Sequence, residues 1–204
     1  MLSYQTVEPH TLELLRRLMA EPSLLGLRLV GGTSLALQYG HRNSVDLDFF
    51  GTLDEDRSTI RDCLKSIGHV AVLKETDKIR IYNLDGVKID FVDYSCYPWI
   101  DDPLVEDGLC LASPKDIAAM KINAIEGRGT RKDFIDVFYL LQRFSLSEIL
   151  GFYQQKYPEY SIFRALMSLT YFNDAEKQNM PKMFKHDTWE EMKSTILKEV
   201  ENYK

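Results

Sequence analysis

The sequence predicts an α/β (α+β) fold, in which a small mixed β-sheet with flanking helices precedes a helical C-terminal portion. Short apolar runs separated by turn residues fill the first half of the chain, as expected for alternating strands and helices. The second half shows longer segments with apolar residues at helical spacing. A chain of 204 residues with 45% hydrophobic and 27% charged residues can bury a substantial core. We therefore expect an α/β core over residues 1–110. A helical portion over residues 111–204 should pack on this core and complete its site.

Turn residues divide the first half into five strands and three helices. Gly40 and Gly68 are the expected stop signals of the second and third helices. The Asp-Gly pair at residues 85–86 predicts a tight hairpin between the last two strands. In chain order we expect a helix over residues 9–20, a strand over 24–30, a helix over 33–39, a strand over 45–49, a helix over 54–67, and strands over 69–74, 78–83 and 87–93.

The second half begins with a clear helix start. Ser113 suits the N-cap, Pro114 suits the first helical position, and Asp116 suits the positive end of the helix dipole. Aromatic residues recur at helical spacing between residues 152 and 172, which favours a place in the core over base stacking. The expected helices cover residues 114–125, 132–143, 146–157, 162–172 and 188–203.

Charge and cysteine usage restrict the classes of function. A net charge of −6 argues against a uniformly basic nucleic-acid binder, although it leaves room for a local basic groove. Residues 121–132 are such a basic stretch, and either a nucleotide site or a solvated helix end would explain them. Three widely separated cysteines without a Cys-x-x-Cys pair indicate reduced thiols rather than a zinc site. No apolar run approaches the roughly 20 residues that span a bilayer, and the N-terminus lacks signal-peptide features. We expect a cytoplasmic protein with no membrane partner.

The most informative motif begins with the turn Gly31-Gly32-Thr33-Ser34, which closes an apolar run and precedes a helix. Glycines allow the backbone to approach a ligand closely, and the N–H groups at a helix start attract an anion. Thr33 or Ser34 is the expected N-cap or phosphate-binding hydroxyl. The turn therefore predicts a cradle for the β and γ phosphates of a nucleotide.

Asp46 and Asp48 follow this turn within twenty residues. On the expected strand they share one face, roughly 7 Å apart at Cα, and the apolar side chains face the other way; these are Val45, Leu47 and Phe49. Mg²⁺ prefers one or two carboxylates together with substrate phosphates, and paired metals can clamp an in-line displacement. A lone Gly-Gly is usually a plain turn and a lone Asp-x-Asp a solvated strand edge, but their combination points to phosphoryl transfer. We expect Asp46 and Asp48 to bind Mg²⁺, or Mn²⁺ in its place.

A third carboxylate is expected from the strand over residues 87–93. Apolar residues alternate with Asp90, so Asp90 should lie opposite the core side together with Lys88. Asp93 shares the core side and lies where the strand ends. If this strand neighbours the one over residues 45–49, the three carboxylates converge, and Asp90 completes the metal site and helps to deprotonate the acceptor. The alternative is an exposed aspartate paired with Lys88.

The wording Gly-Gly-Thr-Ser-Leu-Ala-Leu followed by Asp-Leu-Asp-Phe-Phe resembles the AbiEii/AbiGii-type toxin nucleotidyltransferases of the polymerase-β-like superfamily. The resemblance covers about residues 25–143. It continues in a later helical lysine, Lys121, and in a segment from Arg131 of the form Arg-x-Asp-apolar-x-Asp. In this family such residues belong to the site, which implies that Asp133 is the late acidic residue, with Asp136 as the other choice.

Physical alternatives exist for the later residues. Lys121 lies among small apolar neighbours on its helix, where a compact positive charge can neutralise a triphosphate. It would otherwise be a surface lysine whose stem lies along apolar neighbours. Asp133 would otherwise be a first-turn acid that stabilises the helix dipole.

The resemblance implies a transfer of a nucleoside monophosphate from an NTP to an acceptor hydroxyl, with release of pyrophosphate. It also implies an RNA acceptor, such as a tRNA, and a role as the toxin of a toxin–antitoxin or phage-defence pair with a helix-turn-helix antitoxin. Two alternatives stay open. One is modification of a small molecule, as by aminoglycoside nucleotidyltransferases, and the other is a catalytically silent nucleotide-binding module.

Overall fold

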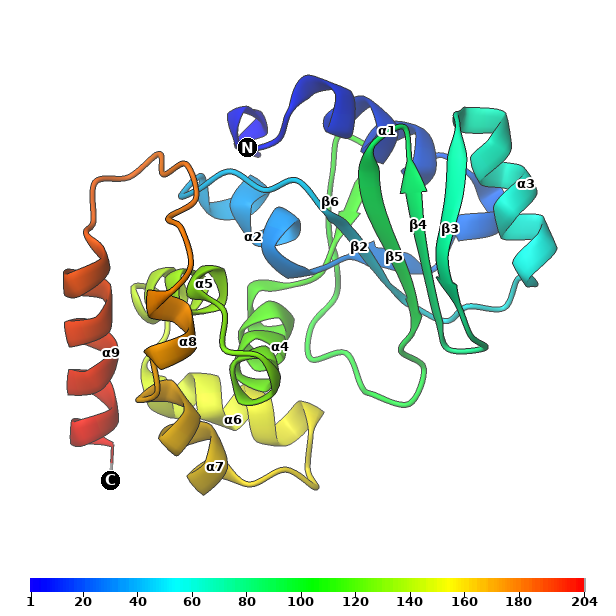
Figure 1. The fold of residues 1–204 in the computed structure, drawn as a ribbon. Helices are drawn as coiled ribbons and strands as arrows, with labels where there is room; N and C mark the ends of the chain where they lie inside the picture. Colours follow the sequence, from blue (N-terminus) through cyan, green and yellow to red (C-terminus); the bar gives the residue numbers. More distant parts are fainter. Residues whose placement is uncertain (204) are drawn as a thin grey trace. The chain divides into compact units, whose positions relative to one another are not determined.

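The computed structural model describes residues 1–203, and the chain in it divides into two compact units (Figure 1). The first unit comprises Met1–Tyr97 and Pro103–Ala112 and contains the sheet. The second comprises Pro98–Asp102 and the chain from Ser113 onward, and it is helical. The predicted α/β class is therefore confirmed.

A mixed sheet forms the centre of the first unit, with seven strands in residues 1–203 and the order β3-β4-β5-β2-β1-β7-β6. Strand β2 runs parallel to β5, and β1 runs parallel to β7, whereas the other neighbours are antiparallel. Figure 1 shows β2, β5, β4 and β3 as successive arrows. The strands are β1 (Leu27–Leu29), β2 (Leu47–Gly51), β3 (Val70–Glu75), β4 (Ile79–Leu84), β5 (Val87–Asp93), β6 (Leu104–Glu106) and β7 (Leu109–Leu111).

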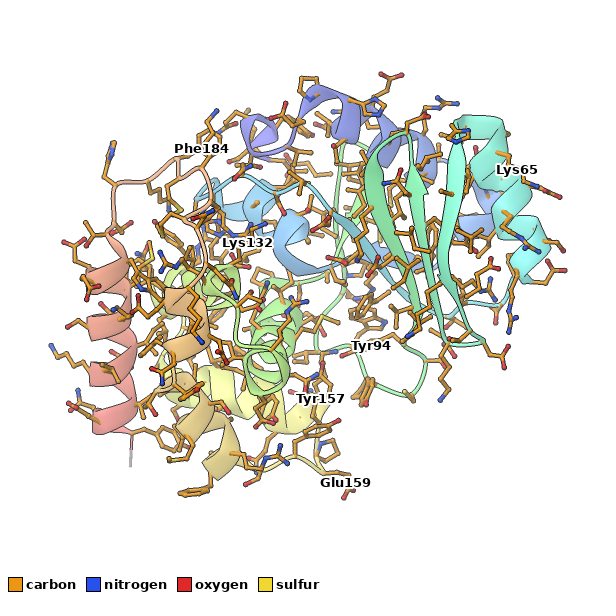
Figure 2. All side chains as sticks on the ribbon, viewed as in Figure 1. Lys65, Tyr94, Lys132, Tyr157, Glu159 and Phe184 are labelled. Carbon is orange, nitrogen blue, oxygen red and sulfur yellow. The ribbon has the colours of Figure 1, made fainter. Side chains whose placement is uncertain are left out.

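Two helices cover one face of this sheet. Buried leucines and isoleucines of α1 (Pro9–Met19) and α3 (Arg57–Ile67) join Phe49 of β2 and Phe91 of β5 in a single core cluster. The polar side of α3 points outward, as Figure 2 shows for Lys65. Because side chains alternate along a strand, the residues between the buried ones in β2 and β5 lie on the opposite face.

Two Asp-Gly hairpins connect neighbouring antiparallel strands. The predicted one joins β4 to β5 through Asp85 and Gly86, whose φ angles are 48° and 89°. A second one joins β6 to β7 through Asp107 and Gly108, at 51° and 76°. The sequence pattern predicts five strands but not β6 and β7, because three residues are too few to display an alternating pattern.

Strand boundaries in the first unit differ from the expected ones. Strand β1 is shorter than residues 24–30 because Pro22–Leu24 form a 3₁₀ turn before it. Strand β2 begins at Leu47, so Asp46 lies one residue ahead of it. Val45 was expected on the core side, and this expectation is wrong: its side chain is exposed.

Helix starts and stops in the first unit also need correction. Helix α3 begins at Arg57, where the Asp56 carboxylate accepts the Thr59 N–H, so the helix is three residues shorter than residues 54–67. Gly68 ends this helix, as predicted, but in an extended rather than a left-handed conformation. Gly40, in contrast, ends its helix with φ at 64°, as predicted.

The second unit begins at the predicted cap, because the Ser113 hydroxyl accepts the backbone N–H of Asp116. The short helix α8 was not predicted, and α7 ends three residues early. Within residues 1–203 no helix combines the length and the apolar character needed to cross a membrane. The helices are α4 (Pro114–Gly127), α5 (Arg131–Leu141), α6 (Leu146–Lys156), α7 (Ile162–Leu169), α8 (Asn173–Glu176) and α9 (Trp189–Asn202).

The aromatic residues of α6 and α7 only partly follow the expected core pattern. Tyr153 and Tyr157 are buried, as predicted. Phe163 and Tyr171 are 70% and 54% exposed, so the prediction of core positions is wrong for them. Phe163 lies on the outer side of the short helix α7, and Tyr171 follows the end of this helix at Leu169.

Candidate functional site

The glycine turn forms the start of α2 (Gly31–Tyr39) and contacts the strand carboxylate. Gly31 has a φ of 67°, and a Cβ built on it would lie 2.6 Å from Oδ2 of Asp48. The Val30 N–H donates to the Asp48 carbonyl oxygen at 2.8 Å and so joins the helix start to β2. Glycine is required at position 31 for both its backbone angle and its missing side chain.

Arg42 also belongs to this region, although no sequence motif predicts it as a site residue. Its side chain is buried, and its Nη2 contacts the place where a Cβ of Gly32 would stand. Its Nη1 donates to the carbonyl oxygen of Asn43 at 2.8 Å. A buried guanidinium beside the first turn of a helix adds positive potential where an anion is already favoured. The sequence signal was an arginine in the short loop between Gly40 and Asp46.

Thr33 and Ser34 lie inside α2, and the expectation that one of them is the N-cap is wrong. Val30 is the N-cap, because Gly31 in its left-handed conformation lets the helix begin earlier. Thr33 donates its single hydroxyl proton to the carbonyl oxygen of Asp46 and also contacts the Ser44 hydroxyl at 2.8 Å. This bond fixes the backbone of Asp46. Contact of either hydroxyl with phosphate stays a prediction.

Asp48 and Asp90 lie side by side in the sheet. They are register partners in the parallel pair of β2 and β5, so both point away from the face that α1 and α3 cover. The condition that the two strands are neighbours is therefore met. Both oxygens of Asp90 lie 2.6 Å from the ammonium of Lys88, which belongs to the same strand. Asp93 lies on the core side, where its carboxylate accepts the Ser95 N–H.

The donor set around Asp48 fits a hard divalent cation. Two carboxylates meet next to a helix start, which suits Mg²⁺ held by few protein ligands and by substrate phosphates. Among residues 1–203, His, Cys, Asp and Glu side chains form no group of three arranged to hold a metal on their own. The joint metal role of Asp46, Asp48 and Asp90 stays a prediction.

A buried ion cluster joins α4 to α5 within the second unit. The Lys121 ammonium lies 2.9 Å from Oδ1 of Asp133 and 2.6 Å from Oδ2 of Asp136, and all three side chains are at most 5% exposed. Arg128 donates to both oxygens of Asp133, at 2.9 and 3.1 Å. The structure thus brings Lys121 and both candidate aspartates together in one place.

Asp133 has a clear structural role at the start of α5. Thr130 and Asp133 form a capping box. Burial alone would raise the pKa of Asp133, but the Lys121 ammonium and the hydrogen bonds from Arg128 more than offset it. The pKa of this carboxyl therefore lies well below its usual range, and Asp133 stays ionised. Both Lys121 as a triphosphate ligand and Asp133 as a site residue stay predictions, and a phosphate would have to share the Lys121 ammonium with two carboxylates.

The sequence matches a known protein family and resembles a known protein over most of its length. The family described as "Nucleotidyl transferase AbiEii toxin, Type IV TA system" matches residues 13–203. An uncharacterized protein of Aquifex aeolicus (strain VF5), aq_aa25, is 33% identical over 181 residues, which are 86% of each chain.

Solved structures share the fold at low sequence identity. JHP933 from Helicobacter pylori superimposes with a TM-score of 0.58 at 17% identity and covers 96% of this chain and 92% of its own. The antibiotic-resistance factor ANT(2'')-Ia, in complex with adenylyl-2''-tobramycin, gives 0.55 at 15% identity and covers 74% of this chain and 98% of its own.

Proposed function

The chain belongs to the AbiEii family of nucleotidyl transferases, and from this premise we propose that it transfers a nucleoside monophosphate from an NTP to a hydroxyl of RNA. The single observation that carries the proposal is the register pair of Asp48 and Asp90 beside the start of α2. For this reaction, two carboxylates can hold Mg²⁺ together with substrate phosphates, and a helix start can bind those phosphates.

In the proposed reaction each group of this region has a distinct task. The N–H groups at Gly31 and Gly32 bind the β and γ phosphates, and the buried guanidinium of Arg42 strengthens this attraction. Asp46, Asp48 and Asp90 would hold Mg²⁺, which when bound would polarise the phosphoryl oxygens and offset the charge on the leaving pyrophosphate. Besides its share in the metal site, Asp90 helps to take the proton of the acceptor hydroxyl.

The bond changes balance without a further reactant. The acceptor oxygen forms a bond to the α-phosphorus, and the bond from that phosphorus to the bridging oxygen breaks. Pyrophosphate leaves with the electron pair of the broken bond. The protein positions the reactants, stabilises the charge on the phosphates and provides one proton acceptor. Positioning and electrostatic stabilisation are the usual contributions of a protein to phosphoryl transfer.

The biological role proposed here follows from the family. Its description as a type IV toxin supports a toxin that acts in the cytoplasm and is countered by an antitoxin, for which we propose a helix-turn-helix protein. The RNA acceptor, for which a tRNA is our first choice, is part of the same proposal. Lys121 and Asp133 are included as site residues of the second unit, with Asp136 as the alternative acid.

A second candidate is transfer to a small hydroxylated molecule. The net charge of −6 supports it, because an acidic surface repels RNA and attracts polycations. The similarity in fold to ANT(2'')-Ia, solved with adenylyl-2''-tobramycin, is consistent with this alternative.

One assay separates the two acceptors. The protein is incubated with Mg²⁺ and each of the four α-labelled NTPs, together with either total RNA or an aminoglycoside mixture. We expect label in RNA, lost by more than about a hundredfold in Asp48→Asn, because the charge stabilisation by metal is lost. Label in the aminoglycosides alone would establish the second candidate. Equal labelling by the parent and Asp48→Asn would contradict the site assignment itself.

A further inference from the structure

Lys88 lies on the same face of the sheet as the two carboxylates, because it precedes Asp90 by two residues on β5. Its ammonium reaches both Asp90 oxygens at 2.6 Å, and Asp90 is the register partner of Asp48. A cation of this chain therefore already occupies the oxygens that the proposed function assigns to metal.

The position of Lys88 has an electrostatic reason. Like charges directly opposite each other on neighbouring strands destabilise a sheet, and such strands lie about 4.8 Å apart. Asp48 and Asp90 are such a pair. The Asp90 side chain is only 18% exposed, so water screens it incompletely. The Lys88 ammonium offsets this repulsion while no metal is bound.

We propose that Lys88 competes with the divalent cation for Asp90 and so lowers the metal affinity of the site. This inference rests on the proposed function. The ammonium and a metal ion repel each other and claim the same carboxylate oxygens. The Lys88 side chain is 43% exposed, so its flexible stem can carry the ammonium into water without unfolding the strand. The site then fills fully only when the phosphates of a nucleotide add their oxygens to the ligand set.

Lys88→Met tests this competition, because methionine keeps the length and apolar stem of lysine and removes the charge. Without metal, we expect a lower melting temperature than in the parent, because the carboxylate repulsion is no longer offset. With Mn²⁺ alone as probe, we expect about tenfold tighter binding, equivalent to about 1.4 kcal/mol. Free Mn²⁺ is measured by electron paramagnetic resonance, and melting is recorded with and without Mn²⁺. If Lys88 had only a structural role, its replacement by methionine would lower the melting temperature and the Mn²⁺ affinity together.

Two lysine variants serve as controls. Lys88→Arg keeps the charge and should bind Mn²⁺ with an affinity close to that of the parent. Lys74→Met removes a charge from the same face, since Lys74 pairs with Ile81 and Ile81 with Asp90 across successive strands. Lys74 lies two strands from Asp90, about a Debye length at physiological salt, so its loss should change the affinity by less than about twofold.

The results separate this inference from the metal site itself. Mn²⁺ binding that is lost in Asp48→Asn and tightened in Lys88→Met supports both. Binding that is lost in Asp48→Asn but equal or weaker in Lys88→Met than in the parent overturns the competition and leaves the metal site intact. If neither the parent nor Lys88→Met binds Mn²⁺, the metal site is contradicted, and the competition with it.

Discussion

Buried charged residues of the second unit, such as Lys121 and Asp133, have partners of opposite charge. Lys121 has two carboxylate partners, and Asp133 has two cationic ones. A buried charge that loses its partner is costly, because neither water nor a counter-ion replaces it. These side chains therefore stabilise the fold whatever further role they have, and this contribution has to be measured before an activity loss is assigned to catalysis.

Replacing Asp133 by asparagine should change how stability depends on pH. The depressed pKa of Asp133 stabilises the folded state above its usual pKa of 3.8, and this contribution is lost as the pH falls toward the folded pKa. We expect Asp133→Asn to be less stable at neutral pH by about 3 kcal/mol and to lose less stability than the parent between about pH 5 and 2. Urea unfolding at a series of pH values measures both.

The control for this prediction is Glu148→Gln on α6. Glu148 occupies the same capping-box position as Asp133 but is exposed. Its loss should change stability much less at every pH. Similar pH profiles for the two variants would show that burial among Lys121 and Arg128 has no special effect.

The candidate site is formed by three elements, which are the start of α2 and the strands β2 and β5. The first residue of α2 touches the carboxylate of β2, and β2 places that carboxylate beside the one on β5. No element supplies the site by itself. A change at the helix start should therefore reach the carboxylate through direct contact.

Gly31→Ala should damage both stability and nucleotidyl transfer. A left-handed backbone costs an L-residue about 1–2 kcal/mol, and the added Cβ also displaces the Asp48 carboxylate. We expect at least about a hundredfold lower turnover, because small misplacements of reacting groups have such effects. Urea unfolding and the labelled-NTP assay measure the two effects.

Gly108→Ala is the matched control, since Gly108 has a similar φ of 76° and nothing within 4 Å of an added Cβ. Gly108→Ala should lose the stability that a left-handed backbone costs an L-residue, and it should keep the nucleotidyl-transfer activity of the parent. If Gly31→Ala retained activity at the level of Gly108→Ala, contact between the helix start and Asp48 would be irrelevant to transfer.

At the scale of the whole molecule, the chain passes between its two units more than once. Pro98–Asp102 belong to the helical unit, whereas the residues on either side belong to the sheet unit. A fully buried ion pair holds this segment: Lys156 contacts Asp116 at 2.8 Å and donates to the Pro98 carbonyl oxygen, and Asp116 accepts the Ile100 N–H. The connection between the units is therefore an integral part of the helical one.

Lys156→Met should loosen this connecting segment. It leaves the Asp116 carboxylate buried without its ammonium, which we expect to cost about 3–5 kcal/mol. Limited proteolysis, followed by mass spectrometry, should show faster cleavage within residues 98–102. Replacing both members of the pair by apolar residues should recover most of the stability, because the uncompensated charge is then removed.

Lys115→Met provides the comparison for this variant. Lys115 pairs with Asp101 of the same segment, but both side chains are more than a third exposed. Surface pairs contribute about 0–1 kcal/mol, so cleavage and stability should stay near those of the parent. Equal cleavage of the two lysine variants would show that the buried pair does not fix the segment.

Local features of this protein were determined by the sequence alone. The bounds of β5, the hairpin at Asp85-Gly86, the stop at Gly40 and the cap at Ser113 all follow from residues within a few positions of each other. The resemblance to the AbiEii family, carried by the glycine turn and the Asp-x-Asp strand, is confirmed for the same reason: the motif lies within one short stretch of chain.

Only the tertiary structure decided which of these local features meet. Side-chain alternation indicated the face of Asp90, but its place beside Asp48 depends on the pairing of β2 with β5, which are separated in the chain by residues 52–86. Arg42 against Gly32, and Lys121 with its two aspartates, likewise depend on contacts through space. Neighbours along the chain set backbone angles and side-chain alternation, whereas the partner of a strand or a buried charge is chosen by the packing of the whole unit.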